Sequence, residues 1–304
     1  MAKALTNRSL LARSGSERAT TWKAWFWITP AVLFVTIFLF YPMLDTIWLS
    51  FFNADSSRFV ALANYSRIFT NAAMLDVLKN NIIWLVLGTT LTVSFGLIIA
   101  VLVDRVRIES AIKAAIFVPM AISFVGAGVI WRFVYEYAPA GQSQIGLLNA
   151  LIGVLHGQPV AWLIDTRWNT IALIIVYVWM WTGFCMVILS ASLKSIPAEI
   201  LEAARMDGAG EITIFFQVTV PMVSSTIAVV ATTMVINILK IFDVVYVMTG
   251  GNYRTNVIAV EYYQQFFNFN NFGVANALTV LLLIVIIPVM VINVRRFREQ
   301  EAQR

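Results

Sequence analysis

The chain has 304 residues, of which 60% are hydrophobic and only 12% are charged, and its mean hydropathy is +0.81. This composition excludes a soluble globular domain and is typical of an integral membrane protein. The net charge of +5 does not indicate nucleic-acid binding, because the basic residues lack the interleaved aromatic stripe that single-strand binders use.

Six apolar segments are long enough to cross the hydrocarbon core of a bilayer, which needs roughly 20 residues per helix. None of them alternates like a barrel strand, and helices satisfy every backbone polar group internally, as the bilayer demands. We therefore predict an all-α integral membrane protein with six transmembrane helices. The predicted spans are 25–49, 81–103, 114–135, 170–193, 226–246 and 277–294.

The distribution of Lys and Arg predicts how these helices are oriented. With the N-terminus inside the cell, fourteen of these residues fall in inner segments and five in outer segments. Because positive charge is concentrated on the cytoplasmic side of membrane proteins, we predict a multi-pass protein of the cell inner (cytoplasmic) membrane with both termini cytoplasmic. Residues 1–24 and 295–304 then form cytoplasmic N-terminal and C-terminal tails.

Polar side chains in the fifth predicted span follow a helical spacing. Asn237, Lys240 and Asp243 succeed one another at intervals of three residues, so on an uninterrupted helix they share one stripe. Charges at membrane depth are costly, and the stripe should face the bundle interior or a wet cavity. The fourth span places Tyr177 and Trp181 on one face. Two interpretations remain open: these five residues line a solute path, or Lys240 and Asp243 pair with each other and the rings only pack.

A polar loop between the fourth and fifth spans carries the most specific pattern in the chain. Glu202-Ala203-Ala204 precedes Asp207 and Gly208, and a hydrophobic group that ends at Pro221 begins after nine more residues. We predict two short amphipathic helices that meet at Gly208, because glycine supplies the freely turning backbone that ends a helix. The two alanines leave a flat face that suits a groove of another protein. The alternative is an ordinary amphipathic linker on the bilayer surface.

With this spacing, the loop resembles the EAA signature of permease subunits in bacterial ATP-binding-cassette (ABC) importers. Phe242-Asp243 and the segment from Tyr246 to Gly251 are similar to landmarks of the carbohydrate importers of the maltose, glycerol-phosphate and alpha-glucoside type. The resemblance implies a type I ABC importer transmembrane domain over 75–294, with a coupling loop at 194–221, after a first helix and external segment at 25–74. The ATPase-coupling residues that it implies are Glu202, Ala203, Ala204, Asp207, Gly208 and Pro221.

The resemblance also implies a division of labour among several proteins. This chain would form half of a pathway for a sugar, glycoside or related polyhydroxy osmolyte, and a second homologous permease, most simply in a heterodimer, would form the other half. Two cytoplasmic ATP-binding-cassette subunits would bind ATP and Mg, and a periplasmic or lipid-anchored solute-binding protein would deliver the solute. The sequence agrees, because it contains no Gly-Lys pair and therefore no phosphate-binding P-loop.

We therefore expect a permease that is not an enzyme, with no catalytic residue, metal or cofactor of its own. A single histidine, His156, and a single cysteine, Cys185, exclude the common zinc clusters. A membrane-embedded enzyme would need clustered catalytic acids or histidines. The alternative function is a subunit of an ion-gradient-driven secondary transporter or channel, which would favour inverted repeats and carboxylates within the spans. Few carboxylates fall within the predicted spans, Asp243 among them, which favours the ABC permease.

Overall fold

A computed structural model describes residues 25–104, 106–139 and 141–302 of the chain. The described residues form helices and loops, with one isolated antiparallel bridge between Phe52 and Phe59 and no further strand pairing among them. The predicted all-α class is confirmed. The predicted tail at 1–24 lies outside the described residues.

Four single helices among the described residues are long and apolar enough to cross a membrane. Trp25–Leu49 matches the predicted first span, and Asn169–Leu193 begins one residue before the predicted fourth span. The last of them lies in a longer helix that continues through the predicted boundary at 294–295 to Ala302. The four are Trp25–Leu49, Ala72–Val103, Asn169–Leu193 and Phe272–Ile292.

Two further spans are pairs of helices that meet at a bend. The chain bends by 101° between Glu109–Ala121 and Phe124–Val134, and by 72° between Glu211–Met222 and Ser224–Leu239. When each pair counts as one span, the described residues hold six, which agrees with the predicted number.

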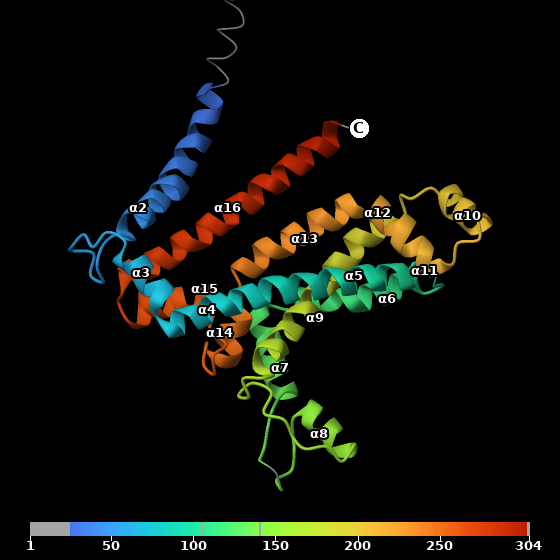
Figure 1. The fold of residues 1–304 in the computed structure, drawn as a ribbon, viewed down its shortest axis with the longest axis horizontal. Coiled ribbons are helices and arrows are strands. Elements are labelled where there is room, and N and C mark those ends of the chain that lie inside the picture. The colour runs from blue at the N-terminus through green and yellow to red at the C-terminus, as the bar shows by residue number, and fades with distance from the viewer. Residues whose placement is uncertain (1–24, 105, 140, 303–304) are drawn as a thin grey trace, which may run out of the picture.

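In Figure 1 the labelled helices α5, α6, α9 and α13 run alongside one another through the middle of the molecule, α16 lies beside α13, and α8 stands away from the bundle. The elements in chain order are η1 (Thr36–Phe40), α2 (Tyr41–Leu49), α3 (Ala63–Thr70), α4 (Ala72–Ile83), η2 (Trp84–Gly88), α5 (Thr89–Val103), α6 (Glu109–Phe117), η3 (Val118–Ala121), α7 (Phe124–Val134), α8 (Leu147–Val154), α9 (Asn169–Leu193), α10 (Ala198–Met206), α11 (Glu211–Ile214), η4 (Phe215–Thr219), α12 (Val220–Met222), α13 (Ser224–Leu239), α14 (Asp243–Thr249), α15 (Ile258–Tyr263), η5 (Gln264–Asn268) and α16 (Phe272–Ala302).

The structure corrects the start of the second predicted span and the continuity of the third. The second helix begins at Ala72 rather than at residue 81, because the side chain of Asn71 accepts hydrogen bonds from the first turn of α4. The third span is not one continuous helix over 114–135. Pro119 lies in the short turn η3, and the Ser123 hydroxyl then caps α7 by accepting a hydrogen bond from the Gly126 backbone N–H at 3.1 Å.

The fifth predicted span, 226–246, is also interrupted. Helix α13 ends at Leu239, Lys240 has φ of −102° and ψ of 15°, and a new helix begins only at Asp243. Lys240 and Asp243 therefore do not lie on the continuous helical stripe that the spacing predicts. The divisions drawn at 74–75 and 294–295 fall inside α4 and α16, so neither coincides with a structural break.

The bundle is held together by tight packing of α5 on α9. A Cβ atom on Gly96 would lie 2.5 Å from the Cβ atom of Cys185, so only glycine permits this approach. The buried core around the contact includes Met186, Leu189 and Met234, which brings α13 into the same cluster. Cys185 is buried in this cluster, which agrees with a packing role.

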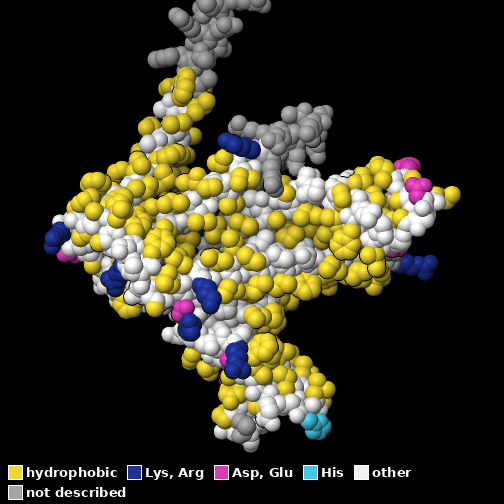
Figure 2. Space-filling model, viewed as in Figure 1, with side chains coloured by type: hydrophobic (Ala, Val, Ile, Leu, Met, Phe, Trp, Pro, Cys, Tyr) yellow, Lys and Arg dark blue, Asp and Glu magenta, His cyan; other side chains and the backbone are white. Residues whose placement is uncertain are grey.

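The surface matches the environment that the composition indicates. Figure 2 shows hydrophobic side chains over most of the visible face, while the charged side chains gather towards its margins. The helix at Trp25–Leu49 has no fully buried residue in its apolar stretch.

Candidate functional site

The loop at 194–221 folds as the sequence predicts, into two helices that meet at Gly208. Helix α10 carries Glu202, Ala203 and Ala204, and it ends at Met206. Gly208 has a left-handed backbone with φ of +83°, and its backbone N–H donates to the Arg205 carbonyl at 3.0 Å. Such a left-handed glycine is the usual end of a helix.

The second helix of the loop runs over Glu211–Met222 and carries Pro221 in its last turn, just before the bend into α13. The side chains of Glu202, Ala203 and Asp207 are exposed on the first helix. Two exposed apolar side chains on the same tip went unnoticed in the sequence: Met206 is 88% and Ile212 is 78% exposed. Their large apolar side chains in a polar loop were the signal that could have revealed them.

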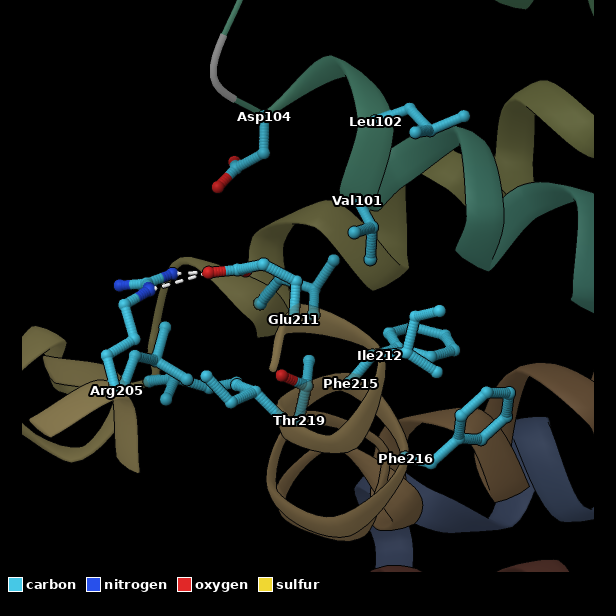
Figure 3. A pocket seen from close by; sticks show the side chains of 13 residues that line it. Val101, Leu102, Asp104, Arg205, Glu211, Ile212, Phe215, Phe216 and Thr219 are labelled. Atoms are coloured by element: carbon cyan, nitrogen blue, oxygen red, sulfur yellow. Dashed lines mark hydrogen bonds and ion pairs between the residues drawn. The ribbon is translucent and has the colours of Figure 1, made fainter. Parts of the chain in front are cut away.

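An ion pair fixes the angle between the two helices of the loop. The Arg205 guanidinium donates from Nε to Glu211 Oε1 at 2.7 Å and from Nη2 to Glu211 Oε2 at 3.3 Å. This two-pronged hydrogen bond raises the pKa of Arg205. Figure 3 shows the pair spanning the turn, next to an apolar cavity of about 470 Å³ beneath the loop. The cavity lining includes Val101, Leu102, Asp104, Phe215, Phe216 and Thr219.

A charged cluster joins the start of the loop to the ends of two membrane helices. Lys194, directly after α9, lies 2.6 Å from Glu109 and 3.9 Å from Asp104. Lys113 donates to Glu109 and to the Ser190 hydroxyl of α9. The cluster therefore ties the start of the loop to the ends of α5, α6 and α9.

A second cavity, of about 250 Å³, lies among the membrane helices, and we call it the central cavity. It brings together all five residues that the sequence selected for a solute path. It is completed by two aromatic side chains and one aliphatic side chain that sequence reasoning missed because each adjoins a helix break. The lining is Phe124, Tyr177, Trp181, Asn237, Lys240, Ile241, Phe242 and Asp243.

Trp181 is the best placed of these residues for binding a polar solute. Its indole Nε1 is a buried hydrogen-bond donor with no partner within the described part of the chain. The indole ring lies 6.1 Å from the ring of Phe124 and 5.5 Å from that of Phe184. Tyr177 is less available, because its hydroxyl is directed at the sulfur of Met234, 4.0 Å away, and its side chain is almost fully buried.

Lys240 and Asp243 form no ion pair with each other among the described residues, although both side chains line the cavity. The pairing considered from the sequence depended on a continuous helix, which the break after Leu239 removes. Ammonium, carboxylate, amide and indole groups thus face one cavity, a set that donates and accepts hydrogen bonds.

The fold and these two sites define a membrane-spanning permease subunit of the ABC importer class, which is not itself an enzyme. The chain belongs to the family of binding-protein-dependent transport system inner membrane components, whose family model matches residues 92–298.

Among curated relatives, the chain is 55% identical over 278 residues to the osmoprotective compounds uptake permease protein GgtC of Synechocystis sp., covering 91% of this chain and 100% of GgtC. It is 43% identical over 278 residues to the alpha-glucoside transport system permease protein AglF of Rhizobium meliloti, covering 91% of this chain and 83% of AglF.

A solved structure supports the fold. A chain of a bacterial ABC transporter involved in the import of the acidic polysaccharide alginate has a TM-score of 0.77 and 20% identity, covering 93% of this chain and 99% of that chain. At this identity the likeness shows the fold alone.

Proposed function

We propose that this permease forms half of an import pathway for a neutral polyhydroxylated solute, a sugar, glycoside or related osmolyte, and that the solute passes through the central cavity. The observation that carries the proposal is that Trp181, whose buried Nε1 donor has no partner among the described residues, lines one cavity together with Asn237, Lys240 and Asp243. A buried donor without a partner is costly unless a ligand or water completes it. The names of the relatives, osmoprotectant and alpha-glucoside permeases, support this class of solute.

The lining suits a hydroxyl-rich solute for a chemical reason. Sugars present hydroxyl groups that donate and accept hydrogen bonds, and C–H faces that stack on aromatic rings. Asn237 and Trp181 supply the first kind of contact and the rings of Phe124 and Phe242 the second. One lysine opposite one carboxylate leaves the cavity without the surplus of cations that a phosphorylated solute would favour.

The proposed assembly contains a second homologous permease, two cytoplasmic ATPase subunits that bind ATP and Mg, and a periplasmic or lipid-anchored solute-binding protein. The apolar helix at Trp25–Leu49, whose apolar stretch has no fully buried residue, supports a neighbouring membrane protein in addition to lipid. Both termini and the loop at 194–221 face the cytoplasm in this arrangement, as the Lys and Arg asymmetry indicates.

Within that assembly we propose that the loop at 194–221 seats in a groove of the ATPase. The small side chains of Ala203 and Ala204 beside the exposed Met206 support close seating, because a flat patch with one projecting apolar side chain suits a groove. The charged cluster at Lys194 and Glu109 then carries the motion of the loop to the ends of the membrane helices.

The central cavity is tested by transport kinetics in membranes that contain the whole transporter. Trp181→Phe removes the Nε1 donor and keeps a ring, and Asn237→Ala removes the amide. We expect both variants to reach the membrane in normal amount and to show a raised half-saturating concentration or a lowered maximal rate for radiolabelled sugars. The loss of one hydrogen bond corresponds to about 0.5–1.5 kcal/mol, or roughly two- to tenfold.

Trp179→Phe is the matched control, because Trp179 lies on the same helix, contacts Trp131 and does not line the cavity. Unchanged kinetics in both cavity variants, normalised to membrane protein, would show that the cavity is not the path. Reporter fusions test the topology separately: fusions after Lys194 and Arg304 should report the cytoplasm and a fusion after Gly157 the outside. An external C-terminus would contradict the proposed orientation.

A further inference from the structure

A row of four aromatic side chains leads away from the central cavity. Phe242 lines the cavity, and its ring stacks on that of Tyr246 with 4.9 Å between centroids and 16° between planes. Tyr263 lies 5.5 Å from Phe242 and 5.1 Å from Tyr246, measured between ring centroids. Phe267 continues the contact 4.9 Å from Tyr263. We call Phe242, Tyr246, Tyr263 and Phe267 the aromatic row.

Two neighbouring helical segments each contribute two rings to the row with the same residue spacing. Phe242 and Tyr246 are four residues apart at the start of α14, and Tyr263 and Phe267 are four residues apart across α15 and η5. Residues at this spacing lie on one face of a helix. The break after Leu239 is what brings Phe242 into the cavity, so the row and the cavity share one cause.

Two of the four rings are exposed, including Phe267 at the far end of the row. Phe242 and Tyr263 are half-buried, whereas Tyr246 is 39% exposed and Phe267 is 58% exposed. Rings that only joined α14 to α15 would be covered by that contact, because burial of the ring is what makes such packing favourable. The row instead offers open ring surface that is continuous with the cavity. In the proposed orientation its far end, in η5, belongs to the external segment between the last two spans.

The row also differs from the exposed part of α16. That part of α16 presents aliphatic side chains, whereas the row presents four rings and two phenol hydroxyls. A phenol joins an apolar face to a hydrogen-bonding group, which a lipid chain does not need and a sugar uses. The exposed side chains of that part of α16 are Ile284, Val285, Ile287, Met290, Val291, Ile292 and Val294.

We propose that the aromatic row is an outer binding track for carbohydrate, which receives the solute on the external side and leads it into the central cavity. The inference rests on the proposed function, because it takes the solute to be a sugar or glycoside. The ligand class is a neutral di- or oligosaccharide or glycoside, whose C–H face lies on the exposed rings while its hydroxyls meet those of Tyr246 and Tyr263.

The test uses the complete transporter with its ATPase and binding-protein partners in proteoliposomes, and a panel of radiolabelled maltose, sucrose and trehalose. Phe267→Leu and Tyr263→Leu keep apolar bulk and remove the ring, and Tyr263→Phe keeps the ring. The matched control is Phe69→Leu, because Phe69 is a 53% exposed ring on helix α3 that lies outside the row. For the best-imported sugar we expect the half-saturating concentration to rise about two- to tenfold in the two row Leu variants.

The maximal rate and the amount of membrane protein should hold in all four variants, and Phe69→Leu should keep the wild-type half-saturating concentration. Tyr263→Phe keeps the ring and loses only the hydroxyl, so its half-saturating concentration should lie between those of the wild type and Tyr263→Leu. Phe267→Leu decides the question if Tyr263→Leu fails to fold, since Phe267 is the most exposed ring. A wild-type half-saturating concentration in Phe267→Leu overturns the track. If Phe267→Leu behaves like the wild type but Trp181→Phe alters import of the same sugar, the aromatic row is not a binding track and the proposal for the central cavity still holds. If the wild type imports no sugar of the panel, both proposals fall.

Discussion

Gly208 offers the sharpest test of the loop at 194–221, because its requirement for glycine comes from the backbone alone. Its φ of +83° lies in the left-handed region, yet a Cβ added there would meet no atom within 4 Å. A substitution therefore strains the turn without any steric clash. The left-handed conformation costs an L-residue roughly 1–2 kcal/mol, and more for a β-branched side chain.

We expect Gly208→Ala to lower the population of the correctly turned loop by roughly 5- to 30-fold relative to its alternatives, since 1–2 kcal/mol corresponds to that factor. Gly208→Val should be worse, and Gly208→Asn should recover part of the loss because Asn tolerates the left-handed region. Gly210→Ala is the matched control: Gly210 has φ of −71° and equally open surroundings. It removes the other glycine of the turn without backbone strain.

The assay is the amount of ATPase subunit that co-purifies with each variant from detergent-solubilised membranes, together with ATP-driven uptake per unit of inserted permease. The predicted order of both quantities is Gly210→Ala near wild type, then Gly208→Asn, Gly208→Ala and Gly208→Val. If Gly208→Val binds the ATPase and transports as well as Gly210→Ala does, the left-handed turn is not needed for docking and the reasoning is refuted.

Three other predictions concern contacts that the structure reveals. Gly96→Ala should force α5 away from Cys185 and lower stability by about 1–3 kcal/mol, seen as a lower melting temperature in detergent, whereas Gly153→Ala, with no atom near its Cβ, should not. Glu109→Gln removes the carboxylate that holds two lysines, so uptake should fall while ATPase co-purification persists; loss of co-purification would contradict a role in transmission. Asn149→Ala removes the amide that donates to two backbone carbonyls and accepts from a backbone N–H and an indole N–H. Leaving such groups unpaired costs about 1–3 kcal/mol. Limited proteolysis should therefore cut the segment around α8 faster while the bundle stays intact.

The number of spans and the extents of the first and fourth could be predicted from the sequence, because membrane spans depend on a simple quantity, the length of an apolar run. The turn of the loop was equally accessible, since Gly208 follows a short amphipathic segment and a left-handed glycine is the commonest way to end a helix. The early start of the second span was missed because residues 72–80 contain Asp76 and Lys79, which lowered the apparent apolarity. Asn71, a good N-cap residue just before that segment, was the available signal.

The two helix breaks were harder to predict, for different reasons. Pro119 and Ser123 are a proline followed by a capping residue and could have indicated the first break, but the surrounding residues are apolar enough to suggest one helix. No glycine or proline lies between Asn237 and Asp243, so local sequence gives no reason for α13 to end at Leu239. The residues that follow the break are nevertheless packed in the core, since Ile241 and Val244 are buried in the same cluster as Tyr177.

The break that was missed explains why the residues chosen for the solute path still meet. On a continuous helix Asn237, Lys240 and Asp243 would form a stripe along one wall, whereas after the break they surround a cavity together with Phe242. Irregular backbone at membrane depth is tolerated where it lines a cavity or is buried in protein, because its freed polar groups then find partners. The backbone N–H groups of Lys240 and Ile241 still reach the carbonyls of Asn237 and Ile238, at 3.3 and 3.0 Å. The turn therefore keeps these backbone groups paired, and the helix break that removed the predicted stripe is what gathers the three side chains around the central cavity.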